Sequence, residues 1–346
     1  MYDFALTLHR RLAPEGDLVW SPYSVASALR LVAAGARGRT YDELVRVLGA
    51  APGELRLAEA AALEDAVIAV ASTLWMRQGL TFEPAYQRAV ADAPGAALHN
   101  ADFAADPDGA RKAINTDVEK TTRELIKELL PPGTVDRDTA AVIVNALYLK
   151  TAWQKVFNKG HTLPIPFYGP GGRCRVPMMR QTERMAYAEA GGWRMVTLPA
   201  EGGVVADVLL GDGGEPSPEL LRRLYASARP EKVTLSLPRF RVESRASLGA
   251  PLGELGVVAA FGNDADFSGI TAGPVRIDRV EHKAVLDVDE DGFEGAAATA
   301  AVMALMGFDT GKPLEFRVDR PFLVVVRQPA TEAVYFLARV TDPLGR

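Results

Sequence analysis

The sequence has little cysteine, no strongly basic block and no long apolar run. Its one cysteine, Cys174, excludes an intramolecular disulfide and a zinc site built from several cysteines. The net charge is −5 and Lys and Arg are scattered, so no nucleic acid is expected as a partner. No apolar stretch reaches the ~18 residues that a membrane-spanning helix needs, so no membrane partner is expected either.

Signatures of catalysis and of metal binding are also missing. The chain has four histidines, and none stands in a known metal-binding spacing: His9, His99, His161 and His282. It has no GxSxG motif, although a Ser/His/Asp triad stays open because its members can be distant in the chain. Residues 287–292 (DVDEDG) resemble the start of an EF-hand loop, but its twelfth position is Ala298 instead of Glu. An acidic strand end before a turn explains this stretch better, and we predict a protein that is not an enzyme and binds no metal or cofactor.

The compartment is only weakly indicated. The first residues (MYDFALTLHRRL) lack the positive start and apolar run of a signal peptide. Together with the lack of disulfides, this favours an intracellular, cytoplasmic protein of a prokaryote. Secretion stays open, because a signal peptide could have been removed before this numbering begins.

The pattern of apolar residues predicts an α+β fold. Helices dominate the first third, and we expect them at residues 4–12, 22–34, 40–48 and 108–122. Strands dominate the rest, with long ones expected at 66–76, 139–150 and 275–288, and four short antiparallel ones at 175–179, 184–188, 193–199 and 204–210. Residues 232–242 and the closing stretches 314–318, 322–327 and 333–340 also read as strands. No linker or repeat divides the chain, so we expect one domain spanning 1–346.

Local helix signals sharpen two of these expectations. Ser21 followed by Pro22 is typical of a helix start. Thr40 with Glu43 three residues later predicts a capping box. Residues 54–64 read as a short helix or loop, and 248–261 as a helix broken by Gly and Pro.

One stretch between two strand-like segments stands out, at residues 290–308 (EDGFEGAAATAAVMALMGF). Its centre contains almost nothing but small residues. A surface loop has no need for so many alanines, and a short isolated helix would be marginal in water. The composition suits a segment that must later fit into a narrow space.

Separate parts of the chain together resemble one protein family. They are residues 4–49 (with DLVWSPYSVASAL), 118–157 (with VNALYLKTAW), 280–303 (VEHKAVLDVDEDGFEGAAATAAVM) and 316–343 (with DRPFLVVV). In this order and spacing they resemble the serpins, over essentially the whole chain. The resemblance implies three β-sheets, eight or nine helices and an exposed reactive-centre loop at about residues 290–315.

The resemblance also implies a mechanism. A serpin of the inhibitory type offers its loop to a serine protease as a suicide substrate, and the protease forms a covalent acyl complex with it. The cleaved loop then inserts as a new strand between two parallel strands of the main sheet, and the acyl-enzyme is trapped. Strand insertion of this kind releases energy stored in the intact protein.

Site residues follow from the resemblance, one motif at a time. The hinge of the loop matches Glu290, Gly292, Phe293 and Glu294. The insertion segment matches Gly295, Ala296, Ala297, Ala298, Thr299, Ala300 and Ala301. A polar cluster beneath the point where the sheet opens matches Ser21, Ser24, Asn145 and His282, and Trp153 matches the residue where the loop enters. Taken alone, His282 also fits a satisfied core histidine.

Family spacing from Glu290 places the reactive bond between Met306 and Gly307, with Leu305 and Phe308 as alternatives. Methionine suits chymotrypsin-, elastase- or subtilisin-like proteases with apolar primary pockets. A trypsin-like target is disfavoured, because no Arg or Lys occurs between Glu290 and Lys312. We expect a monomer. No heparin partner is expected, because the segment 48–66 is shorter than the family helix that often carries a basic heparin site, and it has few basic residues.

One departure from the family pattern supports an alternative function. Phe293 stands where the family has Thr or another small residue, and it should be the first side chain to enter the sheet. A bulky ring there could slow insertion and leave a protease substrate or a non-inhibitory binding or structural protein with the serpin fold. Gly295 replaces the usual alanine, which leaves room for the ring.

Overall fold

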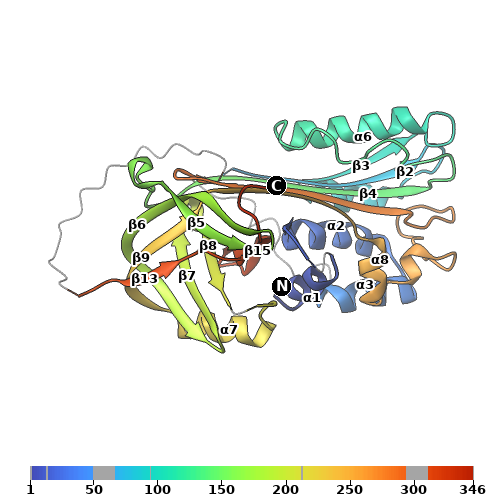
Figure 1. The fold of residues 1–346 in the computed structure, drawn as a ribbon. Helices are drawn as coiled ribbons and strands as arrows, with labels where there is room; N and C mark the ends of the chain where they lie inside the picture. Colours follow the sequence, from blue (N-terminus) through green and yellow to red (C-terminus); the bar gives the residue numbers. More distant parts are fainter. Residues whose placement is uncertain are drawn as a thin grey trace.

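The computed structural model describes residues 2–12, 15–49, 67–93, 95–211, 213–293 and 311–345. Two β-sheets carry the fold, and helices cover both faces of one of them (Figure 1). None of the described helices is long and apolar enough to cross a membrane.

The six-stranded sheet holds the long apolar strands that the sequence predicts. Its order is β10 (Phe240–Ser247), β11 (Arg279–Val288), β12 (Gly292–Phe293), β4 (Ala141–Ala152), β2 (Val67–Arg77) and β3 (Ala96–Ala101). Nearly all of β4 is buried, because α6 (Pro107–Thr121) covers one face of the sheet and α2 (Pro22–Gly35) the other (Figure 1). A strand covered on both faces needs an almost continuous apolar run, as β4 has.

The second sheet has nine strands. Its order is β1 (Leu18–Trp20), β15 (Ala333–Val340), β14 (Phe322–Gln328), β8 (Val205–Leu210), β7 (Trp193–Pro199), β6 (Gly172–Ala190), β9 (Arg229–Pro238) and β13 (Leu314–Arg317), with β5 (Leu163–Gly169) paired to β6. Strand β6 belongs to two groups, because its first part pairs with β5 and its last part with β7. These two groups and the six-stranded sheet make up the three sheets expected from the resemblance.

Seven α-helices lie in the described ranges, at α1 (Tyr2–Leu12), α2, α3 (Gly38–Leu48), α5 (Pro84–Ala91), α6, α7 (Pro218–Ser227) and α8 (Gly249–Glu254). There are also three short 3₁₀ turns in these ranges, η1 (Lys159–His161), η2 (Glu201–Gly203) and η3 (Ala259–Phe261). The helix or loop expected at 54–64 lies outside the described residues. The start of α2 is confirmed, because the Ser21 side chain accepts a hydrogen bond from the Ser24 amide and Pro22 opens the helix.

The predicted capping box of α3 is wrong. The helix begins at Gly38, so Thr40 and Glu43 lie inside it. The Thr40 hydroxyl instead accepts a hydrogen bond from the Asp266 amide, 2.9 Å away. The Glu43 carboxylate accepts bonds of 2.7 Å from the amides of Val258 and Ala259. Both side chains therefore fasten a distant loop instead of capping their own helix.

Several strand predictions also need correction. The two strands expected at 175–179 and 184–188 are one strand, β6, and the stretch 232–242 is divided between β9 and β10. The strand at 275–288 begins only at Arg279, and of the helix at 248–261 only α8 and the turn η3 form. Strand β5 was not predicted, since Pro164 and Pro166 interrupt its pattern.

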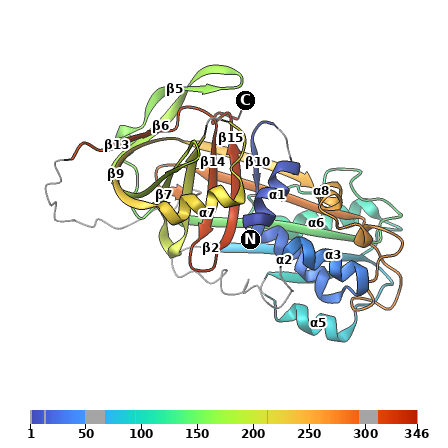
Figure 2. The same ribbon diagram turned by 90° about the horizontal axis from the view of Figure 1, so that it is seen from below.

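Helix α2 forms the centre of the molecule, between the six-stranded sheet and β15 (Figures 1 and 2). Val25, Leu29 and Val32 on this helix are at most 1% exposed. Its amino-terminal end therefore lies directly under the middle of the sheet.

Candidate functional site: a seam in the six-stranded sheet

The parallel strands β4 and β11 are paired along only part of their length. Their register runs from Arg279 opposite Val142 to Lys283 opposite Ala146, and stops there. Beyond this register, residues 147–150 of β4 do not pair with residues 284–287 of β11. We call the gap between these two segments the seam. Further along, β12 lies between the two strands, antiparallel to both.

Strand β12 occupies the open end of the seam. Phe293 lies opposite Thr151 on β4 and Val288 on β11, and Gly292 lies opposite Ala152. The chain that follows Phe293 therefore starts in line with the seam. A strand that continued in the same direction would be antiparallel to both neighbours and could bond to both.

The Phe293 ring is already inside the sheet, with 1% of the residue exposed. Its ring centre lies 4.6 Å from that of Trp153, which is also 1% exposed. Trp153 is held in turn by the loop that leads to β12, because its indole N–H donates to the Asp289 carbonyl at 2.9 Å. Phe293 thus lies in the sheet of the intact protein, and Trp153 provides the place for its ring.

Gly292 is required at the turn into β12. Its backbone φ of +151° is one that residues other than glycine rarely adopt, and a Cβ atom there would lie 2.3 Å from the Thr151 carbonyl oxygen. Asp289 shapes the same turn, because its carboxylate accepts hydrogen bonds from the amides of Asp291 and Gly292. The acidic stretch 287–292 is therefore a strand end and turn, and no cluster of three metal-ligating side chains occurs in the described ranges.

Glu290 anchors the hinge, with 1% of the residue exposed. One Arg239 nitrogen donates to both of its carboxylate oxygens, at 2.7 and 2.6 Å, and the Thr162 hydroxyl donates at 2.6 Å. Burial by itself would raise the pKa of Glu290, but the hydrogen bonds from Thr162 and Arg239 outweigh it, so the pKa lies below its usual value. Asp291 pairs with Lys159 at 2.7 Å, so the hinge is held by two ion pairs.

The other end of the seam is closed by a buried polar cluster. The ring nitrogens of His282 contact the Asn145 side-chain oxygen at 2.8 Å and the Ser21 amide at 3.0 Å. Since the Ser21 amide can only donate, Nε2 accepts from it, and Nδ1–H donates to Asn145. The Asn145 amide group donates to the Ser24 carbonyl at 2.6 Å, and the Ser24 hydroxyl donates to the Ala146 carbonyl at 3.2 Å.

The structure thus brings together the four residues that the resemblance placed in one cluster. His282 and Asn145 are opposite each other in the last paired part of β4 and β11, so their hydrogen bond spans the closed end of the seam. Burial lowers the pKa of His282 to about 4, although the hydrogen bond to Asn145 opposes the shift. The imidazole is therefore neutral and acts as the hydrogen-bond hub, not as a solvent-exposed base.

Sequence reasoning missed four residues of this site. Ser72 on β2 extends the cluster, as its hydroxyl accepts from the Asn145 amide group at 3.3 Å. Arg239, Thr162 and Lys159 hold the hinge, but each comes from a segment distant in the chain. Nothing in the local sequence marks them, so only the fold identifies them.

The rest of the predicted loop lies outside the described residues. This applies to Glu294 of the hinge, to the insertion segment from Gly295 to Ala301, and to Leu305, Met306, Gly307 and Phe308. The described chain resumes at Gly311 and enters β13, which pairs with β9 in the other sheet. The two ends of the loop are therefore fixed in different sheets.

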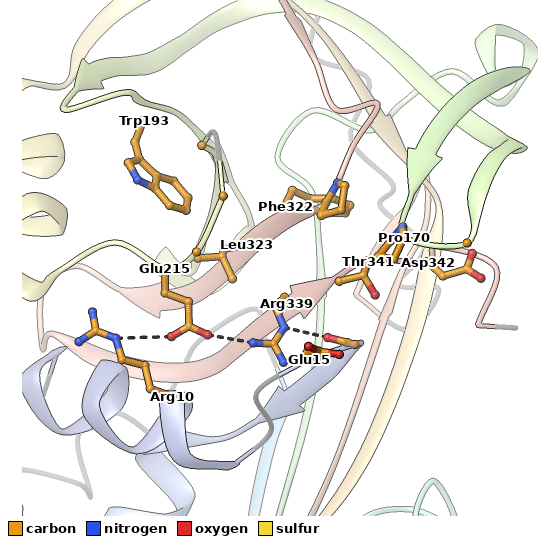
Figure 3. Close-up of a pocket in the computed structure, with 16 residues that line it drawn as sticks. Arg10, Glu15, Pro170, Trp193, Glu215, Phe322, Leu323, Arg339, Thr341 and Asp342 are labelled. Carbon is orange, nitrogen blue, oxygen red and sulfur yellow. Dashed lines mark hydrogen bonds and ion pairs between the residues drawn. The ribbon is translucent and has the colours of Figure 1, made fainter.

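A pocket of about 1150 Å³ lies away from the seam, between α1, β14 and the end of β15 (Figure 3). Glu215 stands between Arg339, at 3.1 Å, and Arg10, at 3.7 Å, and Arg339 also donates to the Gly16 carbonyl. Glu215, Arg339 and Arg10 thus pair with one another in its wall. We assign no function to this pocket.

Comparison with known proteins identifies the family that has this fold and this site. The family model for serpins (serine protease inhibitors) matches residues 1–343. The chain belongs to the serpin family. Serpin-Z2A of rice (Oryza sativa subsp. japonica) is 33% identical over 99% of this chain and 96% of its own length, and the leukocyte elastase inhibitor of the pig (Sus scrofa) is 32% identical over 98% and 97%.

Solved structures agree. Serpin48 of the insect Tenebrio molitor, described as a highly specific serpin, superimposes with a TM-score of 0.86 at 26% identity, over 99% of this chain and 96% of that one. The chain therefore has the serpin fold. It belongs to a family of protease inhibitors and is not an enzyme. Family membership supports protease inhibition as the general function and a serine protease as the kind of partner.

Proposed function

We propose that this serpin is a suicide inhibitor of serine proteases with apolar primary pockets. The observation that carries the proposal is the seam, where no strand of the described residues lies between 147–150 and 284–287, and β12 lies at its open end. In this mechanism the protease serine attacks the Met306 carbonyl carbon and forms an ester. The bond to Gly307 breaks, and the new amine of Gly307 takes up a proton and leaves.

In this proposal the freed loop continues the strand β12 in the same register. Because Phe293 lies opposite Thr151 and Val288, each further residue moves one position back along both strands. Thr299 would then lie opposite both Asn145 and His282, at the closed end of the seam. Phe293, Gly295, Ala297, Thr299 and Ala301 would then face the core, where small side chains fit.

Insertion is favourable because one strand gains two neighbours. About a dozen inserted residues form on the order of twenty ladder bonds, each worth about 0.5–1.5 kcal/mol net. The cost is the short parallel pairing from Arg279 to Lys283 and the Asn145–His282 hydrogen bond. The balance is on the order of ten kcal/mol, comparable with the stability of a whole domain.

The proposal includes the target class, the reactive bond and the state of the protein. Met306 fits chymotrypsin-, elastase- or subtilisin-like enzymes, with Leu305 and Phe308 as alternative positions for the cleaved bond. The inhibitor acts as a single domain and a monomer, without a cofactor.

A second candidate is a serpin fold that binds a partner or is cleaved without trapping. The seated Phe293 ring favours it, because a mouth filled by a large side chain could hold the loop without further insertion. The seam beyond the ring favours inhibition.

One experiment distinguishes the two. The protein is mixed with chymotrypsin, elastase and subtilisin in turn, boiled in SDS and separated by electrophoresis. Inhibition predicts a covalent adduct at about the summed masses, and mass spectrometry of the released fragment then identifies the cleaved bond. Complete cleavage by all three enzymes with no adduct would exclude the suicide mechanism for this protease class.

A further inference from the structure

A long stretch of the chain beside the hinge contains no acidic residue. No Asp or Glu occurs from residue 139 to residue 182, although the whole chain has 44 of them among 346 residues. The same stretch contains six Lys and Arg residues. Part of this lack reflects the buried strand β4, but residues 154–175, which follow it, contain four Lys and Arg residues and no Asp or Glu, in a protein whose net charge is −5.

The segment 154–175 of this stretch contacts the base of the loop through its first part. The Phe157 amide donates to the Glu290 carbonyl at 2.9 Å, and the Thr162 hydroxyl donates to the Glu290 carboxylate at 2.6 Å. Trp153 and Phe157 point into the core, so the residues between them face outward. This surface therefore lies beside the hinge from which the loop starts.

Apolar side chains are exposed on the same surface. Of the five large apolar residues exposed in the described ranges, three lie here, with exposed fractions of 46% for Val156, 58% for Leu163 and 53% for Tyr168. Leu163 begins β5, which pairs only with β6 and forms the edge of its group. Exposed apolar residues gathered in one region are typical of contact sites.

Two cations on this surface remain available to a partner. Lys159 is used by Asp291, and Arg175 donates to the Pro164 carbonyl. Lys155 and Arg173 are exposed and form no ion pair with the described residues. Arg173 lies opposite Tyr168 in the pairing of β5 with β6, so a cation and an aromatic ring are neighbours there.

We propose that residues 154–175 form a second contact site for the target protease, suited to a protease with an acidic and partly apolar surface beside its active site. The inference rests on the proposed function for the identity of the partner. An acidic protease is repelled by the net charge of the chain and attracted at this one surface, which orients it toward the loop. The interleaved apolar residues favour a protein over a sulfated polysaccharide.

The test of the charges uses chymotrypsin and succinylated chymotrypsin, which share one active site but differ in surface charge. The readout is the second-order rate constant for loss of intact chain, with adduct and cleaved product counted together. The double variant Lys155→Glu/Arg173→Glu is compared with Arg88→Glu, an exposed arginine on α5, at the end of the molecule distant from β13 (Figure 2).

We expect the natural protein to react faster with the succinylated enzyme, and the double variant to lose this advantage, with a rate about tenfold lower at low salt. The advantage should disappear at about 0.5 M NaCl, and Arg88→Glu should leave the rate unchanged. Equal rates for the natural protein and the double variant with both enzymes would overturn the proposal.

The apolar part is tested by Leu163→Ser, with Val258→Ser as the control because Val258 is 54% exposed. Leu163→Ser should lower the rate several-fold at every salt concentration, and equal rates for the two variants would contradict the apolar contact. A heparin titration separates the other class of partner. If heparin binds and the double variant abolishes this binding while protease rates stay unchanged, the surface is a polyanion site and the proposal is wrong.

These outcomes are independent of the proposed function. Rates that respond to the substitutions without any SDS-stable adduct would refute trapping and retain the contact site. An SDS-stable adduct that forms at unchanged rates in all variants would refute the contact site and retain trapping.

Discussion

Replacing Phe293 by Ala tests whether the hinge is seated in the sheet. The ring is 1% exposed and lies 4.6 Å from the Trp153 ring, so the substitution removes a fully buried aromatic side chain. Such a loss costs about 3–5 kcal/mol in a rigid core. Strand β12 is short and can leave the seam, which limits the loss, so we expect about 3 kcal/mol.

The measurement is urea unfolding of the intact protein, followed through its first transition. A double-mutant cycle with Trp153→Ala isolates the contact between the rings, for which we expect a coupling of about 1 kcal/mol. Phe293→Leu serves as the control, because it keeps most of the apolar volume and should cost little. A loss below about 1 kcal/mol for Phe293→Ala, as for an exposed residue, would refute the seated hinge.

The same variant separates two views of inhibition. If Phe293 blocks insertion, a small residue should trap protease more efficiently. If β12 is instead the part of the loop that is already inserted, Phe293→Ala should slow further insertion and raise the number of inhibitor molecules consumed per protease molecule. We expect the second result, because the ring keeps the same partners before and after insertion. Titration of chymotrypsin activity with each variant measures this number.

Three further predictions concern the ends of the seam. Because burial lowers the pKa of His282 from 6.5 to about 4, the unfolded chain binds more protons between these values, and stability should fall by an amount on the order of 3 kcal/mol as the pH falls from 6.5 to 4. His282→Gln should remove this dependence, and the same dependence in both proteins would contradict it. Arg239→Ala removes the cation beside the buried Glu290 carboxylate and leaves the hydrogen bond from Thr162, so it should lower the free energy of unfolding by about 2 kcal/mol. Arg239→Lys keeps the charge and should lower this free energy less. Equal losses for the two variants would contradict the ion pair between Arg239 and Glu290. Thr299→Arg should abolish trapping but not cleavage, because it would place a charge between Asn145 and His282, and Thr299→Ser should retain trapping; an adduct with Thr299→Arg would contradict the proposed register.

Much of the fold could be predicted because its core strands carry their own signal. The apolar run of β4 reflects burial on both faces, and the Ser21–Pro22 start of α2 reflects a local hydrogen bond. Thr40 and Glu43 misled for the same reason, since a capping pattern is local and tertiary partners in the loop at 258–266 outcompeted it. Strand β5 was missed because its prolines are tolerated only at a sheet edge, which the sequence does not reveal.

The site divides in a similar way. The cluster of Ser21, Ser24, Asn145 and His282 was accessible through the family motifs that contain it. The seated position of Phe293 was not, because it depends on the space beside Trp153. The partners of Glu290, Arg239 and Thr162, come from segments far apart in the chain, and no local pattern links them.

The most direct measurement compares the melting temperatures of intact and loop-cleaved protein. The account predicts that the seam fills with a strand after cleavage, which adds on the order of ten kcal/mol of ladder bonds. For a domain of this size the melting temperature should then rise by about 20 °C or more. An unchanged melting temperature after complete cleavage near Met306 would show that the loop stays outside the sheet, and would contradict the central claim.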